Sequence, residues 1–160
     1  MDHHQVLQTL LRVIKQSGQP VDQTAFIADY LQRDLLNLCF GNSDNHGRNT
    51  AIIKTPHNIS LAPVFDFAPM KADPEGIVRA TNWSKDYQLA STVNWPKLCE
   101  SFQDQAESEA IFEALIALAK KLVGLRERLA ARGISALILD MPAMGFKSLD
   151  QNLKRWQLLP

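Results

Sequence analysis

The chain reads LCFGNSDNHGRN at residues 38–49, and the change of composition inside this segment decides the fold expected around it. Its apolar start ends a pattern of buried residues at helical spacing that begins after Asp22, a typical N-cap residue. Gly41 is a typical helix stop, and the residues from Gly41 to Gly47 favour turns and left-handed backbone. The sequence therefore predicts a helix over residues 22–40 and a structured loop directly after it.

Outward from this segment, the pattern predicts further helices and one hairpin. Apolar residues at helical spacing predict a first helix that ends near residues 17–20. The other expected elements are strands at Ala51–Ile53 and Ile59–Ala62, a long loop over 68–93, and helices over 95–102, 109–132 and 148–156. Gly133 is expected to cap the helix over 109–132. The predicted fold class is mainly α with a small β-hairpin, in a single domain over residues 1–160.

Composition excludes several classes of function. The 17 basic and 17 acidic residues cancel, and no basic run is longer than a pair, so we expect no direct binding of nucleic acid. No apolar stretch is long enough to span a bilayer, and no signal peptide is recognisable, so a cytoplasmic location is expected. Cys39 and Cys99 lie among apolar neighbours and are expected to be buried free thiols. His3 and His4 are expected to lie on a mobile terminus, where they neither bind a metal nor mark a tag remnant.

Asp44 and Asn49 carry the strongest chemical signal. Phosphoryl transfer needs a carboxylate that orients the acceptor hydroxyl, and oxygen ligands that hold Mg²⁺. Protein-kinase catalytic loops space these two functions as Asp-x-x-x-x-Asn, which is the interval from Asp44 to Asn49. One hairpin later, Asp66-Phe67-Ala68 stands where kinases place an Asp-Phe-Gly triplet that binds the metal. Each feature alone also fits a turn-rich loop, but their shared order favours a kinase C-lobe.

The segment from Asn37 to Asn49 resembles the signature of the HipA family, in which an Asp-x-His-Gly-Lys-Asn core follows an apolar helix. The later segment from Leu61 to Asp66 is similar to the Leu-x-Pro-x-Tyr-Asp segment of that family. The resemblance implies a protein-kinase-like C-lobe of the HipA C-terminal type. It also implies an ATP- and Mg²⁺-dependent serine/threonine kinase of the HipA/HipT toxin class.

By this resemblance, Asp44 is the catalytic aspartate, and Asn49 and Asp66 are the metal ligands of the nucleotide site. Arg48 replaces the usual Lys of the family and keeps its charge near the cofactor, but not its point-charge geometry. His46 is a further candidate in the catalytic loop, where it either bonds the loop or a phosphate, or shapes the turn. The Asp-x-His-x-x-Asn pattern is also similar to phosphoinositide-kinase catalytic loops.

The seven glycines never cluster, so the sequence contains no Gly-rich cradle for phosphates. We therefore expect that the ATP-covering N-lobe of a kinase is absent from this sequence. Three functions stay open. The chain is a C-lobe that is active when an N-lobe is supplied, a non-enzymatic interaction or regulatory module, or a metal-dependent phosphohydrolase that uses Asp44, His46 and Asp66. The family resemblance further implies an aminoacyl-tRNA synthetase as protein substrate and a HipB-type antitoxin as partner.

Overall fold

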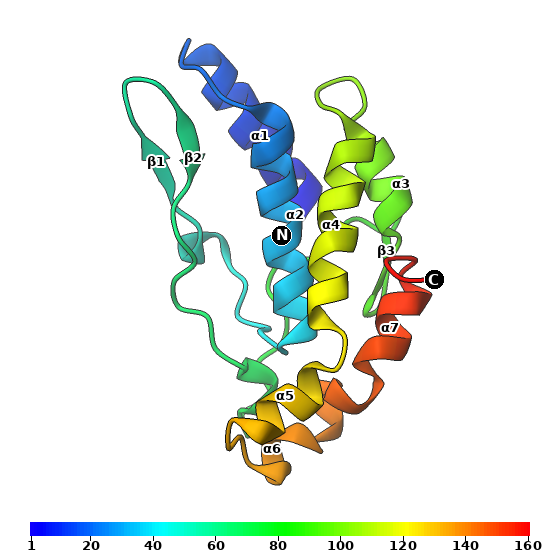
Figure 1. Cartoon of the computed structure of the whole chain (residues 1–160). Coiled ribbons are helices and arrows are strands. Elements are labelled where there is room, and N and C mark those ends of the chain that lie inside the picture. Colours follow the sequence, from blue (N-terminus) through cyan, green and yellow to red (C-terminus); the bar gives the residue numbers. More distant parts are fainter.

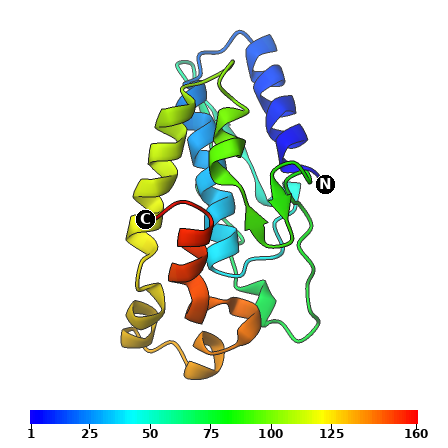
Figure 2. The same cartoon turned by 90° about the vertical axis from the view of Figure 1, so that its right-hand side faces the viewer.

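Helix α2 (Gln23–Cys39) runs through the middle of the molecule and organises the elements around it. A computed structural model describes residues 1–160 and shows α2 packed most extensively against α4 (Ser108–Leu122), with α1 (His3–Gln16) also in contact (Figure 1). In the side view, α2 lies between α1 and α4, and α3 (Trp95–Glu100) lies in front of it (Figure 2). The fold is thus a group of helices around one central helix.

The local sequence explains where α2 begins and what it buries. The Asp22 carboxylate accepts a hydrogen bond from the Ala25 N–H at 2.9 Å, which satisfies one of the free amides of the first turn. Phe26, Ile27, Leu31 and Leu35 are all buried on the face toward the core. The predicted helix over 22–40 and its N-cap are therefore confirmed to within one residue at each end.

The predicted hairpin is confirmed as an antiparallel pair, β1 (Ile52–Lys54) with β2 (Ile59–Leu61), in which Ile53 lies opposite Ser60. β2 buries Ile59 and Leu61, whereas all of β1 is exposed. The hairpin stands beside α2 on the side opposite α4 (Figure 1). Its far end leads directly into the segment that carries Asp66.

The region over 68–93 was wrongly predicted as loop throughout, because it contains a second antiparallel hairpin, β3 (Gln88–Leu89) with β4 (Thr92–Val93). Strands of two residues are too short to show an alternating pattern in the sequence. The turn between them places Ala90 at a φ of 52°, which is uncommon for a residue with a side chain. The fold class stays mainly α, but with two small hairpins.

The single helix predicted over 109–132 is also wrong, because α4 ends at Leu122 and α5 (Leu125–Ala131) follows as a separate helix. Gly124 between them has a φ of 66°, and its N–H donates to the Asp150 carboxylate of α7 (Leu149–Arg155) at 3.2 Å. The remaining elements are α6 (Ala136–Leu139) and the short 3₁₀ helices η1 (Gly47–Asn49), η2 (Met70–Ala72), η3 (Pro142–Met144) and η4 (Phe146–Ser148).

Thirty buried apolar residues form one core cluster. All three tryptophans belong to it, and Cys39 and Cys99 are buried free thiols as expected. Burial raises the pKa of each thiol to about 12, so neither thiolate forms near neutral pH.

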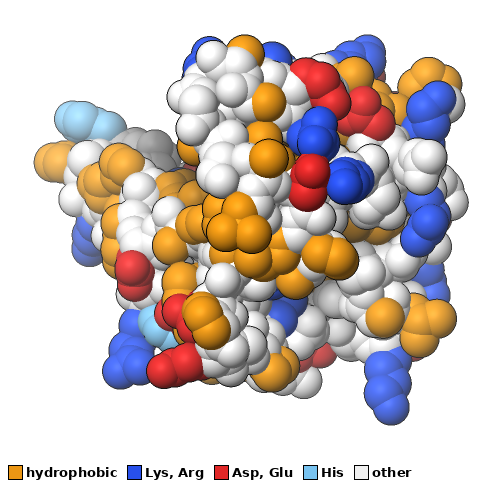
Figure 3. Space-filling view, turned by 90° about the horizontal axis from the view of Figure 1, so that it is seen from below, with side chains coloured by type: hydrophobic (Ala, Val, Ile, Leu, Met, Phe, Trp, Pro, Cys, Tyr) orange, Lys and Arg blue, Asp and Glu red, His pale blue; other side chains and the backbone are white.

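No helix combines the length and apolar character needed to cross a membrane. The end formed by α5 and α6 carries a gathering of apolar side chains near the middle of its face (Figure 3). Leu137 on α6 is 76% exposed.

Gly41, which follows α2, and Gly76 both have left-handed backbone but differ in packing, so alanine substitutions at the two positions measure conformational strain with and without a packing effect. Gly41 and Gly76 have φ values of 65° and 66°, but an added Cβ at Gly41 would lie 2.9 Å from Met144 Sδ, whereas Gly76 faces open space. We expect Gly76→Ala to lower the free energy of unfolding by about 1–2 kcal/mol through strain alone. Gly41→Ala should cost about 1 kcal/mol more through overpacking. Urea unfolding of both variants measures the difference, and equal losses would contradict it.

Candidate active-site loop

The first residue of the loop over residues 42–49 is hydrogen-bonded through its side chain to α2. Asn42 is buried, and its carboxamide Nδ2 donates to Asn37 Oδ1 at 3.0 Å. Its Oδ1 accepts from the Asp44 N–H at 3.2 Å, which forms an Asx turn. On the other side, the Gly41 carbonyl accepts from the Lys71 N–H at 2.9 Å. The start of the loop is therefore fixed both to α2 and to the chain beyond Asp66.

Asp44, His46 and Asn49 lie together in this loop. The Asn49 carboxamide Nδ2 donates to the Asp44 carbonyl at 3.0 Å, and the Asn49 side-chain oxygen accepts no hydrogen bond from the chain. The Asp44 carboxylate Oδ1 lies 3.5 Å from His46 Nε2. The side chains of Asp44 and His46 are 35% and 30% exposed. The loop thus has a partly exposed carboxylate at one end and an amide oxygen without a hydrogen bond at the other, and the Asn49 side chain joins the two ends.

Arg48 and Asp66 make no hydrogen bond or ion pair with the other three candidates. Arg48 is exposed on η1. Asp66 is exposed with a φ of 53°, a left-handed conformation that Asp tolerates better than most residues, and its carboxylate has no protein partner. Such strained backbone is concentrated at functional sites. The Asp66 carboxylate is therefore free to bind a ligand.

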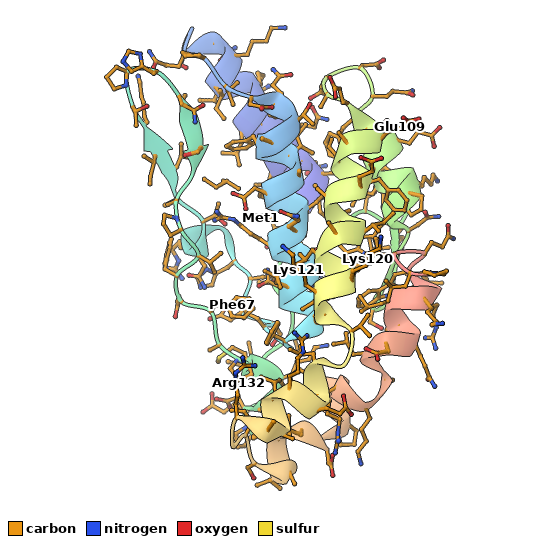
Figure 4. All side chains as sticks on the ribbon, viewed as in Figure 1. Met1, Phe67, Glu109, Lys120, Lys121 and Arg132 are labelled. Carbon is orange, nitrogen blue, oxygen red and sulfur yellow. The ribbon has the colours of Figure 1, made fainter.

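A cavity of about 310 Å³ opens between the loop, α1, α2 and the first hairpin. His46 and Asn49 line it, whereas Asp44, Arg48 and Asp66 do not. Its apolar lining comes from Met1, Val6, Leu10, Tyr30, Leu36, Ile52, Val64, Phe65 and Phe67. Figure 4 places Met1 and Phe67, two of the lining residues, on the hairpin side of α2. The cavity thus combines an apolar wall with the polar groups of the loop.

The donor set of Asn49 and Asp66 fits Mg²⁺, which prefers hard oxygen ligands and binds through one or two carboxylates together with phosphate and water. The Asn49 carboxamide oxygen and both Asp66 carboxylate oxygens have no hydrogen bond within the chain, so they are available for this role. No group of three or more His, Cys, Asp or Glu side chains is placed to hold a metal ion. The alternative of a metal-dependent phosphohydrolase therefore finds no preformed ligand cluster.

A buried carboxylate beneath the loop was missed by the sequence analysis. Asp34 on α2 is 1% exposed, and Arg79 Nη2 donates to its two oxygens at 2.5 and 2.7 Å. The indole Nε1 of Trp83 donates to Asp34 Oδ2 at 2.7 Å, and His3 Nε2 lies 3.2 Å from Asp34 Oδ1. We call Asp34, Arg79, Trp83 and His3 the Asp34 cluster. It connects α2 with the N-terminus and with the segment that follows Asp66.

The expectation that His3 lies on a mobile terminus is wrong. His3 is 5% exposed, and its Nδ1 lies 2.9 Å from the Tyr30 hydroxyl. The backbone around it is paired, because the His3 N–H donates to the Asn82 carbonyl at 2.8 Å and the Asn82 N–H to the Met1 carbonyl at 3.1 Å. For Asp34, the one signal in the sequence was its position on the apolar face of α2, next to Leu31 and Leu35, which could have indicated a buried charge.

The electrostatics of the cluster keep Asp34 ionised. Burial opposes its negative charge, but the charges of His3 and Arg79 and the hydrogen bonds from both outweigh burial and hold the pKa of Asp34 below its ordinary value. Burial, followed by the charge of Asp34, raises the pKa of Tyr30 above its ordinary range. Asp34 is thus a permanent anion at neutral pH.

A family model described as the HipA-like C-terminal domain matches residues 2–123. The matched region contains the loop over 42–49, the first hairpin, Asp66 and the whole Asp34 cluster. It ends directly before the break at Gly124. No curated protein and no solved structure matches the chain significantly.

Asp34 gives a testable dependence of stability on pH. Because its pKa is lowered in the folded chain, its stabilising effect is fully present above the unfolded value of about 3.9 and is lost as the pH falls toward the folded value. Asp34→Asn leaves Arg79 buried without a counter-charge and should cost about 3–5 kcal/mol at pH 7. Urea unfolding at pH 7 and pH 3 should show the gap to wild type narrowing in acid.

The matched control is Asp29→Asn, which removes the i,i+4 pair of Asp29 with Arg33 on the outer part of the same helix. A partly exposed pair of this kind contributes about 0.3–0.5 kcal/mol. A loss for Asp34→Asn that is as small as for Asp29→Asn, or a gap that widens in acid, would contradict the assigned role of Asp34.

Proposed function

The chain belongs to the HipA-like C-terminal domain family, and we propose that it is the catalytic C-lobe of a serine/threonine protein kinase. In this proposal the chain helps to transfer the γ-phosphate of ATP to a protein hydroxyl. The observation that carries the proposal is the loop geometry, in which Asn49 donates to the Asp44 carbonyl and leaves its own oxygen free. A metal ligand and a proton acceptor are then presented from the two ends of one rigid loop.

Each candidate residue has a role that matches its surroundings. Asp44 orients the acceptor hydroxyl and accepts its proton, which its partly exposed carboxylate permits. Asn49 and Asp66 would hold Mg²⁺, and bound Mg²⁺·ATP supplies the phosphoryl group and charge neutralisation. Arg48 is exposed next to Asn49 and offers a positive charge to phosphate oxygens. His46 lies close enough to Asp44 to keep that carboxylate directed toward the acceptor.

Activity also requires groups that these 160 residues do not contain. No Gly-rich loop is present to cover the phosphates, so we propose that an N-lobe, from a longer chain or from a separate partner, completes the site. The apolar wall of the cavity, including Ile52 and Phe65, is partly exposed and is available for the base of the nucleotide or for such a lobe. An aminoacyl-tRNA synthetase as substrate and a HipB-type antitoxin as partner remain proposals by family resemblance.

Calorimetric titration of the chain with ATP and Mg²⁺ tests the nucleotide site directly. We expect a Kd tighter than about 1 mM for wild type. Asp66→Ala should weaken binding at least about tenfold through loss of a charged metal ligand, whereas Asp44→Ala should leave it nearly unchanged because Asp44 acts on the acceptor hydroxyl. Asp104→Ala is the matched control, since Asp104 is an exposed aspartate without a hydrogen bond or ion pair.

The catalytic part of the proposal is tested after an N-lobe is supplied. Wild type should then transfer labelled phosphate to a protein hydroxyl, and Asp44→Ala should abolish transfer while the circular dichroism spectrum stays unchanged. Absence of transfer from the completed wild-type complex would favour the interaction module instead.

A further inference from the structure

Asn45 stands between Asp44 and His46 and is more deeply buried than either. Asn45 is only 8% exposed, whereas the side chains of its two neighbours are about one third exposed. Its carboxamide bonds to both backbone groups of a single residue, because Nδ2 donates to the Thr81 carbonyl at 2.9 Å and Oδ1 accepts from the Thr81 N–H at 3.1 Å. Asn45 therefore binds Thr81 as a neighbouring strand would.

The Asp34 cluster holds the partner of Asn45 in place. Arg79 Nε donates to the Thr81 carbonyl at 2.8 Å while its Nη2 bonds Asp34, so the carbonyl accepts from both Asn45 and Arg79. Asn45 Nδ2 also lies 3.1 Å from His3 Nε2. The Asn45 carboxamide thus ties the loop to a charged cluster whose groups are all on other elements, beside a longer backbone bond from the Ala80 N–H to the Ser43 carbonyl at 3.4 Å.

This arrangement has a direct consequence for the residues on either side. A loop rich in Asn, Gly and Ser has many accessible conformations, and each ordered residue costs about 1–2 kcal/mol of backbone entropy. With Asn45 fixed inward and Asn42 fixed to α2, the Asp44 backbone has a fixed point on each side. The direction of the Asp44 and His46 side chains is then set by the backbone.

We infer that Asn45 is a positioning residue, which holds Asp44, His46 and Asn49 in the geometry that binds Mg²⁺·ATP and receives the acceptor hydroxyl. This inference rests on the proposed function and deepens it. It also makes the segment around Thr81, which follows Asp66 in the chain, a structural part of the same site. The loop and that segment form one unit because the two short Asn45–Thr81 bonds and the longer Ala80–Ser43 backbone bond join them.

The test compares two buried amides that bond the same region. Gln88 is also 8% exposed, and its carboxamide accepts from the Trp83 N–H at 2.9 Å and donates to the Ala90 carbonyl at 2.7 Å, but it does not touch the loop. Asn45→Ala and Gln88→Ala each remove a buried carboxamide. Only Asn45→Ala should weaken Mg²⁺·ATP binding, by about tenfold, the factor that corresponds to the backbone entropy of about one loop residue ordered on binding.

Amide hydrogen exchange followed by NMR gives a readout that does not depend on the nucleotide. Asn45→Ala should accelerate exchange at Asn49, whose N–H donates to the His46 carbonyl, and shift the amide signals of Asp44 and His46. The indole N–H signal of Trp83 should persist, because its bond to Asp34 is intact. Gln88→Ala should leave the loop signals in place.

Three outcomes overturn the inference. They are loop signals that do not change in Asn45→Ala, an equal change of loop and affinity in Gln88→Ala, and fast exchange of the Thr81 N–H in wild type. The exchange rate of the Thr81 N–H is measured in wild type, so it tests whether Asn45 holds the loop even if Asn45→Ala does not fold. If wild type binds no Mg²⁺·ATP, the proposed function fails, whereas the exchange data still decide whether Asn45 holds the loop.

Discussion

The carboxylate of Asp34 is the charge around which this fold is arranged. A carboxylate that is 1% exposed is stable only when charged and hydrogen-bonding groups surround it, and here Arg79, Trp83 and His3 do so. These groups come from the N-terminal segment and from the chain beyond Asp66. Ionisation of one residue on α2 therefore requires that the N-terminal segment and the segment after Asp66 meet at this helix.

The candidate active-site loop depends on this meeting point. Most of its residues favour turns, which makes them suitable for presenting side chains but poor at maintaining a single conformation. Asn42 fixes the loop to α2, and Asn45 fixes it to Thr81, beside Arg79. Groups that would bind ligands, such as the Asp66 carboxylate, have no hydrogen bond within the chain, because other residues make the hydrogen bonds that hold the loop in place.

The parts of the fold that were predicted correctly have strong local signals. The bounds of α2 follow from a capping Asp, an apolar face and a terminal Gly, all within one segment. The break between α4 and α5 was missed because the apolar pattern continues across Gly124, and the bond from its N–H to Asp150 joins residues 26 positions apart. The second hairpin was missed because its strands have only two residues each.

The sequence by itself determined the chemical groups of the candidate site and their order. The spacing from Asp44 to Asn49, and the position of Asp66 after a hairpin, are properties of short segments, so they are visible without a structure. Only the tertiary structure decided which residues hold these groups in place. Asp34 and Arg79 are 45 positions apart, and Asn45 and Thr81 are 36 apart. Their pairing follows from how the helices pack, because a buried polar group must bond to whatever partner the packed core brings within reach.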